Sequence, residues 1–276
     1  MDSFKEQCIA LRKQDKSVIE IMKITGRPKT SIYQHIKDIP LSPARIQQYR
    51  AAAAARIKKY PLERKGKSVR QFSRFNHWTP DTVQLVAHLL FDGEITHGSC
   101  VYNNRSLALI QHVEKLMQSL YSFEPRQWLN QLTGVLRISY HNVALSAYMR
   151  EKTLNLLKEV GGLSMECKRA FLKAFFDDEG CMDFRPAIHH RQVRGYQKDV
   201  PILVLVQRLL NDFDIPARVV KPNEVVIVGK ENLMRFDREI NFSPGVYMNG
   251  NRSNSRWKKH VEKRALLKQA IASFKS

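Results

Sequence analysis

One short motif occurs twice in the chain, and it limits the possible folds more than any other feature. Residues 85–93 (LVAHLLFDG) recur as residues 172–180 (LKAFFDDEG), with Leu, Ala and Gly at matching places. In both copies an acidic residue, Asp92 or Glu179, directly precedes the Gly. A repeat of this kind is typical of two structural units that share one topology.

The segments after each motif follow one order. Apolar spacing and alternation predict a hairpin, an apolar helix, two strands and a closing helix. In the first unit these are residues 94–102, 107–121, 125–132, 134–144 and 145–160. In the second unit they are residues 181–196, 200–213, 217–221, 224–229 and 231–240. We therefore predict an α+β protein with two pseudo-symmetric αββαββα units at residues 79–160 and 161–243.

The acid at the end of each motif helix has an unfavourable position. The C-terminal end of a helix already carries partial negative charge, so an acid there costs about 0.5 kcal/mol. Its occurrence at two equivalent positions indicates a compensating cation. If the helices pack along a pseudo-twofold axis, Ala87 and Ala174 allow close approach and the two carboxylates repel unless a divalent metal lies between them. The alternative is two unrelated amphipathic helices that each end by chance in an acid and a Gly, and the matched order of elements argues against it.

The first 45 residues predict a small all-α helix-turn-helix domain. One helix covers residues 4–14, Ser17 caps a second, and the turn at residues 26–28 precedes a third. The third helix would present six side chains to a major groove, namely Lys29, Ser31, Tyr33, Gln34, His35 and Lys37. A plain three-helix bundle without DNA contacts is the alternative. Residues 46–78 are predicted to form a basic linker that binds the phosphate backbone of a nucleic acid. Residues 244–276 are predicted to form a basic C-terminal tail with a helix at 257–274.

The net charge indicates a polyanionic partner. Lys and Arg number 46 against 26 Asp and Glu, which gives +20. No apolar run reaches the roughly 18 residues of a spanning helix, and the N-terminus has no signal-peptide core. The four Cys are scattered, which predicts reduced thiols and no zinc site. No P-loop, Rossmann glycine pattern or nucleophile elbow is present. We expect double-stranded DNA as the partner, no membrane, and a cytoplasmic, nucleoid-associated location in a prokaryotic host.

Residues 79–243 resemble the LAGLIDADG homing endonucleases in their single-chain form, and residues 89–93 and 175–180 carry the most specific part of the likeness. The resemblance implies that the motif helices form the interface between units and that the sheets form a β-saddle in the major groove. It implies that Asp92 and Glu179 are catalytic and bind Mg²⁺, two or three divalent ions in all, with the carbonyls of Phe91 and Asp178 as further ligands. A monomer would then cut both strands of a long asymmetric target and leave short 3′ overhangs.

The resemblance also suggests helper residues. The family often has a lysine after the last strand, and Lys230 fits that place in the second unit, where it is equally well an ordinary residue at the start of a helix. The first unit has no matching lysine at residues 138–141. Asn103 and Gln197, which each follow a Tyr, are candidates for organising water.

If the sheets face DNA, alternate strand positions should carry polar side chains toward it. The candidates in the first unit are Thr96, Gly98, Arg126, Asn130, Arg137 and Ser139, and those in the second are Arg185, His189, Arg191, Arg194, Arg218 and Lys221.

Two other functions fit the same sequence. One is a non-cleaving DNA-binding regulator, similar to bacterial sporulation regulators that combine a decayed LAGLIDADG-like domain with a helix-turn-helix. The other is an intron RNA-splicing maturase, which charge alone does not separate from a DNA-binding protein. The survival of both acids favours the endonuclease.

Overall fold

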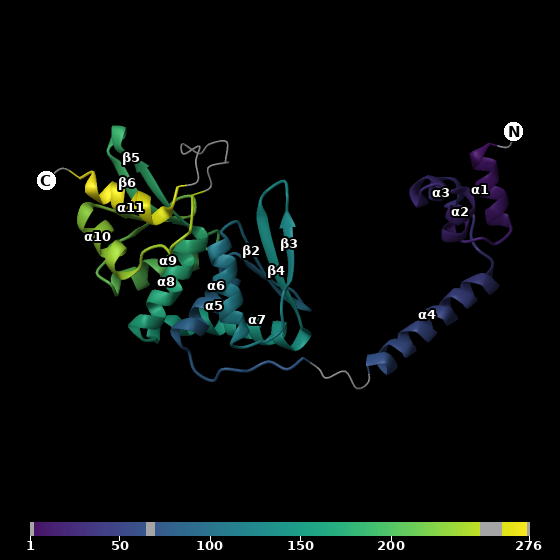
Figure 1. Cartoon of the computed structure of the whole chain (residues 1–276), viewed down its shortest axis with the longest axis horizontal. Helices are drawn as coiled ribbons and strands as arrows, with labels where there is room; N and C mark the ends of the chain where they lie inside the picture. The colour runs from purple at the N-terminus through teal and green to yellow at the C-terminus, as the bar shows by residue number, and fades with distance from the viewer. Residues whose placement is uncertain (1–2, 65–69, 249–260, 275–276) are drawn as a thin grey trace. The chain divides into compact units, whose positions relative to one another are not determined.

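The computed structural model describes residues 3–64, 70–248 and 261–274 (Figure 1). The chain divides into two compact units, Met1–Val69 and Arg70–Ser276. Within the described ranges, none of the helices combines the length and the apolar character that crossing a membrane requires.

The N-terminal unit is helical. Helices α1 (Phe4–Lys13), α2 (Val18–Thr25) and α3 (Lys29–Ile36) precede a long helix, α4 (Pro43–Arg64). Serine capping boxes start α1 and α2, and Gly26 ends α2 with a φ of 67°. A small core joins the first three helices through Cys8, Ile21, Ile32 and Ile36. The three predicted helices are confirmed.

The stretch predicted as a basic linker, residues 46–78, has two different structures. Its first part belongs to α4. Residues after Arg70 instead pack on the second unit, where the backbone N–H of Phe75 donates to Tyr148 Oη (2.9 Å) and Trp78 Nε1 donates to Glu159 Oε2 (2.6 Å). Aromatic side chains in this segment therefore make it part of the core rather than a free tether.

The second unit consists of two halves with one topology. The first half contains α5 (Pro80–Phe91), β1 (Gly93–Ile95), β2 (Ser99–Asn104), α6 (Leu107–Gln118), β3 (Arg126–Asn130), β4 (Val135–His141) and α7 (Val143–Glu159). After the short turn η1 (Val160–Gly162), the second half contains α8 (Met165–Glu179), β5 (Gly180–Arg185), η2 (Pro186–Ile188), β6 (His190–Tyr196), α9 (Val200–Asn211), β7 (Arg218–Val220), β8 (Glu224–Val228) and α10 (Lys230–Glu239). Helix α11 (Lys263–Ala272) follows.

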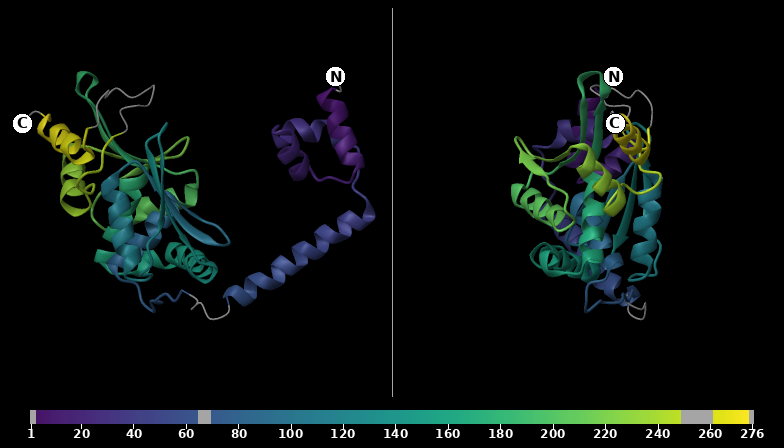
Figure 2. Two further views of the ribbon diagram at one scale, coloured as in Figure 1. Left: turned by 45° about the vertical axis from the view of Figure 1, so that its right-hand side comes forward. Right: turned by 90° about the vertical axis from the view of Figure 1, so that its left-hand side faces the viewer.

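Each half forms a four-stranded antiparallel sheet, in the orders β1-β2-β4-β3 and β5-β6-β8-β7. Helices cover one face of each sheet (Figure 2). The predicted α+β fold with two repeated units is therefore confirmed.

Helices α5 and α8 pack against each other at the centre of this unit (Figure 1). Both are buried on most sides, as helices with apolar residues around much of their circumference must be. Ala87 and Ala174 are fully buried, and their small side chains allow the two backbones to approach closely.

Gly93 and Gly180 allow each central helix to pass directly into a strand. A Cβ atom on Gly93 would lie 2.3 Å from the carbonyl oxygen of Leu89, and one on Gly180 would lie 2.3 Å from that of Phe176. No side chain fits at either junction. The acid before each Gly is thereby fixed at the point where helix becomes strand.

The two halves differ beside these junctions. Gly93 pairs with Tyr102, whereas Gly180 pairs with Gly195, so Tyr102 and Gly195 are equivalent positions. A Cβ on Gly195 would lie 2.4 Å from Cε1 of Phe175, a buried residue. In the second half, the ring of Phe175 therefore occupies the space next to Gly195.

We expect Gly195→Ala to destabilise the protein by about 2 kcal/mol, because the buried Phe175 ring has no room to move away. Gly98→Ala is the matched control, since nothing lies within 4 Å of the added Cβ there. Chemical denaturation monitored by circular dichroism measures both free energies of unfolding. Equal stability of the two variants would show that the Phe175 contact is not restrictive.

Candidate active site

The two motif acids lie at the same end of the α5–α8 pair. Asp92 is the C-cap residue of α5, and Glu179 is the last residue of α8. Each is partly buried. The close packing of the helices and the glycine junctions therefore bring together the two carboxyl groups that the repeat predicted as a pair.

The environment makes ionisation of both acids unfavourable. Burial, with the negative charges of Asp178 and Glu179, raises the pKa of Asp92 to about 8. Burial, with the negative charge of Asp178, raises the pKa of Glu179 to about 7. Ordinary carboxyl groups are ionised well below these values. The pair therefore holds protons near neutral pH unless a cation replaces them.

One cation comes from the chain itself. Lys263, at the start of α11, is buried, and its Nζ donates to the carbonyl oxygens of Asp177 (2.6 Å) and Phe176 (3.3 Å). These are carbonyls of the last turn of α8, where a positive charge is favourable. The charge of Lys263 also lowers the pKa of Asp92 and of Glu179, although by less than burial raises them. Lys263 thus supplies part of the compensation that the acid-Gly pattern predicted.

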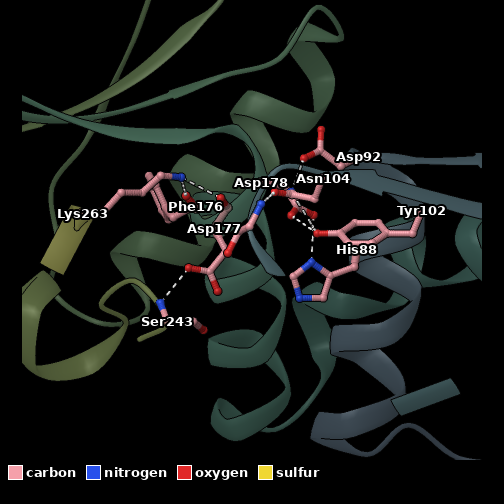
Figure 3. Close-up of polar contacts among 10 residues, drawn as sticks. His88, Asp92, Tyr102, Asn104, Phe176, Asp177, Asp178, Ser243 and Lys263 are labelled. Carbon is pink, nitrogen blue, oxygen red and sulfur yellow. Dashed lines mark hydrogen bonds and ion pairs between the residues drawn. The ribbon is translucent and has the colours of Figure 1, made fainter. Parts of the chain in front are cut away.

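The same end of α8 is tied to the following loop. Asp177 is almost fully buried, and its Oδ1 accepts a 2.7 Å hydrogen bond from the backbone N–H of Ser243 (Figure 3). Residues after the second repeat therefore fix the helix end that carries Glu179.

A buried ion pair crosses between the halves. His88 Nδ1 lies 2.8 Å from Asp178 Oδ2, and neither side chain is exposed. Burial opposes charge on the imidazole, but the carboxylate of Asp178, with smaller contributions from Asp177 and Asp92, outweighs burial and raises the pKa of His88. Tyr102 donates from Oη to the other oxygen of Asp178 at 2.6 Å. Asp178, which the sequence suggested only for its carbonyl, therefore uses its side chain to join α8 to α5 and β2 (Figure 3).

Asn104, rather than the predicted Asn103, is the amide at Asp92. Asn104 Nδ2 donates to Asp92 Oδ2 at 2.8 Å, whereas only the backbone N–H of Asn103 contacts Asp92, at its carbonyl. Successive side chains of a strand point to opposite faces, so a shift of one residue moves Asn103 to the face away from the helices. Gln197 is the equivalent of Asn104, because it also lies two residues after the partner of the junction glycine.

The acid pair fits a hard divalent cation. No group of three or more His, Cys, Asp and Glu that could hold a metal occurs within residues 3–64, 70–248 and 261–274. The carboxylates of Asp92 and Glu179 and the end-of-helix carbonyls of Phe91 and Asp178 instead offer oxygen ligands only. Mg²⁺ suits such a site, since it binds through one or two carboxylates and keeps positions for water and phosphate oxygens.

Two predicted helper residues lie elsewhere. Lys230 is the exposed first residue of α10. The side-chain oxygen of Gln197 accepts from the backbone N–H of Asp199 at 3.4 Å. Within the described residues, neither side chain hydrogen-bonds to Asp92 or Glu179.

The face of the first sheet that points away from the helices carries some of the predicted DNA-binding residues. Arg126, Trp128 and Arg137 lie on it, in register with Ser139 and Asn103. Thr96 and Gly98 lie in the β1–β2 turn rather than at the strand positions expected for them, and Thr96 Oγ1 accepts from the N–H of Ser99. Two other polar groups are already used within the sheet. Ser139 Oγ donates to the carbonyl oxygen of Arg126 and lies 3.1 Å from His141 Nε2, and Asn130 Oδ1 accepts from the backbone N–H of Leu132 in the β3–β4 turn.

The corresponding face of the second sheet is organised by ion pairs. Arg185 donates through two nitrogens to Asp183, and Arg194 bridges Asp183 and Glu224. Arg218 lies in register with Val226, which pairs in turn with Arg194. His189 and Lys221 lie in turns.

Arg191 is on the wrong face for the predicted role. It pairs with Phe184 in the β5–β6 register, so it points to the helix-covered side. There it donates to Ser273 Oγ (2.6 Å) and lies over the ring of Phe274. It anchors the end of the C-terminal segment rather than facing outward. Of the predicted helix at residues 257–274, α11 covers Lys263–Ala272, and residues 257–260 lie outside the described part.

In the N-terminal unit, α3 exposes most of its predicted contact residues. Lys29, Tyr33 and Gln34 are exposed, as is Lys37 just after the helix. Ser31 is half-buried, and His35 packs edge-on against Phe4 with ring centroids 5.5 Å apart.

The two halves share one topology and meet through the acid-bearing helices α5 and α8. They define a tandem α+β protein with a carboxylate pair at the interface of its halves. Residues 166–241, which make up most of the second half, match the family model of the LAGLIDADG-like domain. The chain thus contains a LAGLIDADG-like domain, as its motifs predicted. No curated protein matches the chain.

Several solved structures are similar. The homing endonuclease I-DmoI in complex with DNA and Mn is 19% identical and has a TM-score of 0.45, with 58% of this chain and 96% of that chain covered. The N-terminal LAGLIDADG domain of DUF199/WhiA is 15% identical, with a TM-score of 0.46 and coverage of 62% and 88%. Full-length DUF199/WhiA from Thermatoga maritima is 14% identical, with a TM-score of 0.48 and coverage of 74% and 63%. Similarity this low says nothing about what this chain binds or cleaves.

The raised pKa values predict a pH-dependent stability without metal. A carboxyl whose pKa is higher in the folded than in the unfolded state stabilises the fold fully below the unfolded pKa, near 4, and loses this contribution as pH rises through the folded pKa. Between pH 5.5 and 8 in EDTA, the wild type should lose stability relative to Asp92→Asn by an amount on the order of 2 kcal/mol. Urea denaturation at both pH values measures this difference. Parallel pH profiles for the two proteins would contradict it.

Proposed function

We propose that this protein is a site-specific DNA endonuclease of the LAGLIDADG type that cuts both strands with divalent metal at Asp92 and Glu179. The observation that carries the proposal is the acid pair itself. Two carboxyl groups with pKa values raised to about 8 and about 7 converge where two halves meet. Carboxyl groups with strongly raised pKa values cluster at functional sites, and a divalent cation between the two acids would relieve their repulsion.

The basic surface supports DNA as the substrate. The chain carries a net charge of +20, and the sheet faces that point away from the covering helices bear arginines. Arg126 and Arg137 supply positive charge in the first half, and Arg185, Arg194 and Arg218 in the second. Arginine donates to phosphates and to guanine edges, so these faces suit a duplex that crosses both halves. Because one chain supplies both halves, a monomer on a long asymmetric target suffices.

The residues would act in a simple order. Arginines of the two faces bind the backbone and orient the duplex, and the acid pair lies between the halves at the site of hydrolysis. Bound Mg²⁺ would supply charge neutralisation and a more acidic water. Asp92 and Glu179, with the carbonyls of Phe91 and Asp178, would hold it. Lys230 remains our candidate for contact with a phosphate, and Asn103 and Gln197 for ordering water.

A non-cleaving DNA-binding regulator is the second candidate. Its supporting observation is the N-terminal helical unit, in which α3 exposes Lys29, Tyr33 and Gln34 in the manner of a recognition helix. Such a unit reads DNA without any need for hydrolysis. Both functions require DNA binding, so only a cleavage assay separates them.

The decisive experiment incubates the full-length protein with a randomised double-stranded DNA library and Mg²⁺, then sequences the ends. One long consensus with staggered ends would establish the endonuclease. Recovery of bound but uncut DNA would support the regulator, and a parallel arm with structured RNA tests the maturase alternative.

We expect Asp92→Asn and Glu179→Gln each to abolish Mg²⁺-dependent cleavage while DNA affinity changes by less than about 3-fold. Each substitution removes a charged oxygen ligand and preserves the side-chain volume, so metal binding suffers and the DNA-binding faces do not. Gel-based cleavage and fluorescence anisotropy measure the two properties. Cleavage retained by either variant would remove that residue from the site.

Deletion of residues 1–45 should weaken affinity for the selected target by about 10-fold or more, because the phosphate and base contacts of α3 are lost. The rate of cleavage at saturating protein should be unchanged. A full-length variant with Lys29, Tyr33, Gln34 and Lys37 all replaced by Ala is the matched control for the deletion. Unchanged affinity in both would exclude DNA contact by the N-terminal unit.

A further inference from the structure

A chain of hydrogen bonds links Asp92 to the opposite half of the protein. It runs from Asp92 to Asn104, from Asn104 to Tyr102, and from Tyr102 to Asp178, which His88 holds from the other side (Figure 3). Four of these residues lie in the first half, and Asp178 lies on α8 of the second.

The orientation of the Asn104 amide is determined by its surroundings. Its Oδ1 accepts a 2.9 Å hydrogen bond from the backbone N–H of Ser106, which can only donate. Nδ2 must therefore face the other way, where it donates to Asp92 Oδ2 (2.8 Å) and to Tyr102 Oη (3.2 Å). Both amide hydrogens are used, and one oxygen of Asp92 is held in place.

Tyr102 has a single arrangement for the same reason. Its hydroxyl hydrogen is directed to Asp178 Oδ1 at 2.6 Å, so its oxygen is left to accept from Asn104. Asp178 can only accept while it is ionised, and His88 Nδ1 occupies its second oxygen. Ser106 sets the orientation of the Asn104 amide, and Tyr102 links that amide to a carboxylate of the other half.

The described residues of the second half form no such chain. The residues equivalent to His88 and Tyr102 are Phe175 and Gly195, and the equivalent of Asp178 is Phe91. Where the His88–Asp178 ion pair lies on one side of the helix crossing, the Phe91 and Phe175 rings meet edge to face on the other, with centroids 5.2 Å apart. Among the residues that the structure describes, Glu179 therefore has no cross-half support equivalent to that of Asp92.

We propose that His88, Tyr102 and Asp178 are positioning residues that act through Asn104 to hold the Asp92 carboxylate ready for a divalent cation. The inference rests on the proposed metal site and identifies what fixes its first ligand. With one oxygen of Asp92 held by Asn104, the other is left for the metal. Mutation of partners that orient a ligand in this way typically weakens metal affinity by about 10- to 100-fold.

The test removes one oxygen atom. Tyr102→Phe deletes the hydroxyl that joins Asn104 to Asp178, and Tyr121→Phe is its matched control. Both tyrosines are 1% exposed, but Tyr121 Oη has no hydrogen-bond partner within the described residues. Mn²⁺ is titrated into each full-length protein, without DNA, and free Mn²⁺ is followed by electron paramagnetic resonance. Melting temperature and DNA affinity are measured on the same samples.

We expect Tyr102→Phe to weaken Mn²⁺ binding by about 10-fold and Tyr121→Phe to leave it unchanged. DNA affinity should be the same in both, which separates positioning from a general structural effect. If Tyr102→Phe does not fold, Asn104→Ala tests the same link, with Gln197→Ala as its equivalent in the other half. The Asn104 variant should lose Mn²⁺ affinity, and the Gln197 variant should lose less.

The outcomes separate this inference from the proposed function. Equal Mn²⁺ affinity in Tyr102→Phe and Tyr121→Phe, or in Asn104→Ala and Gln197→Ala, would overturn the positioning role while the metal site stands. A wild type that binds no Mn²⁺, or that binds it no better than the Asp92→Asn, Glu179→Gln double variant, would overturn both.

Discussion

The packing of α5 against α8 is the contact on which the rest of the second unit depends. Small side chains at Ala87 and Ala174 permit close approach, and glycines at 93 and 180 let each helix enter its strand without a loop. Two acids consequently lie at one end of the helix pair, where backbone dipoles already disfavour negative charge. The sheets continue from these same junctions. The geometry that builds the halves therefore also brings the two acids together.

The C-terminal segment is part of this centre although it lies outside the repeated halves. Lys263 reaches the last carbonyls of α8, and Ser243 binds Asp177 beside them. An ammonium group buried with carbonyl partners is stable only where negative charge is near, and Asp177 contributes most of that charge, with less from Asp178 and Asp92. The charge of Lys263 lowers the pKa of both acids without restoring ordinary values. A cation from the chain thus offsets part of the repulsion and leaves the remainder for an ion from solution.

Much of this architecture could be predicted from the sequence because it depends on local patterns. The helices and strands of both halves, and the pairing of Asp92 with Glu179, follow from periodicity and repetition. Asn104 was missed because strand alternation makes a one-residue error a change of face, and the order of polar residues does not reveal the register. Arg191 was misplaced for the same reason. His88 carried a signal, as a polar residue within an apolar helix, but its partner Asp178 could be found only once the two helices were seen to cross. Lys263 had no local signal, because a long-range contact determines its role.

The exchange of His88 and Asp178 for Phe175 and Phe91 across the pseudo-twofold axis determines which halves can pair. Two copies of the first half would place each His88 against Phe91 and leave the imidazole without its carboxylate. Two copies of the second would place each Asp178 against Phe175 and bury a carboxylate without a partner, which is strongly destabilising. Only unlike halves satisfy both contacts. A chain that joins the halves covalently can keep such an asymmetric pair, whereas a symmetric dimer cannot, because any residue placed on one side of its axis recurs on the other. The polar chain that holds Asp92 therefore requires two unlike halves, and this one polypeptide supplies both.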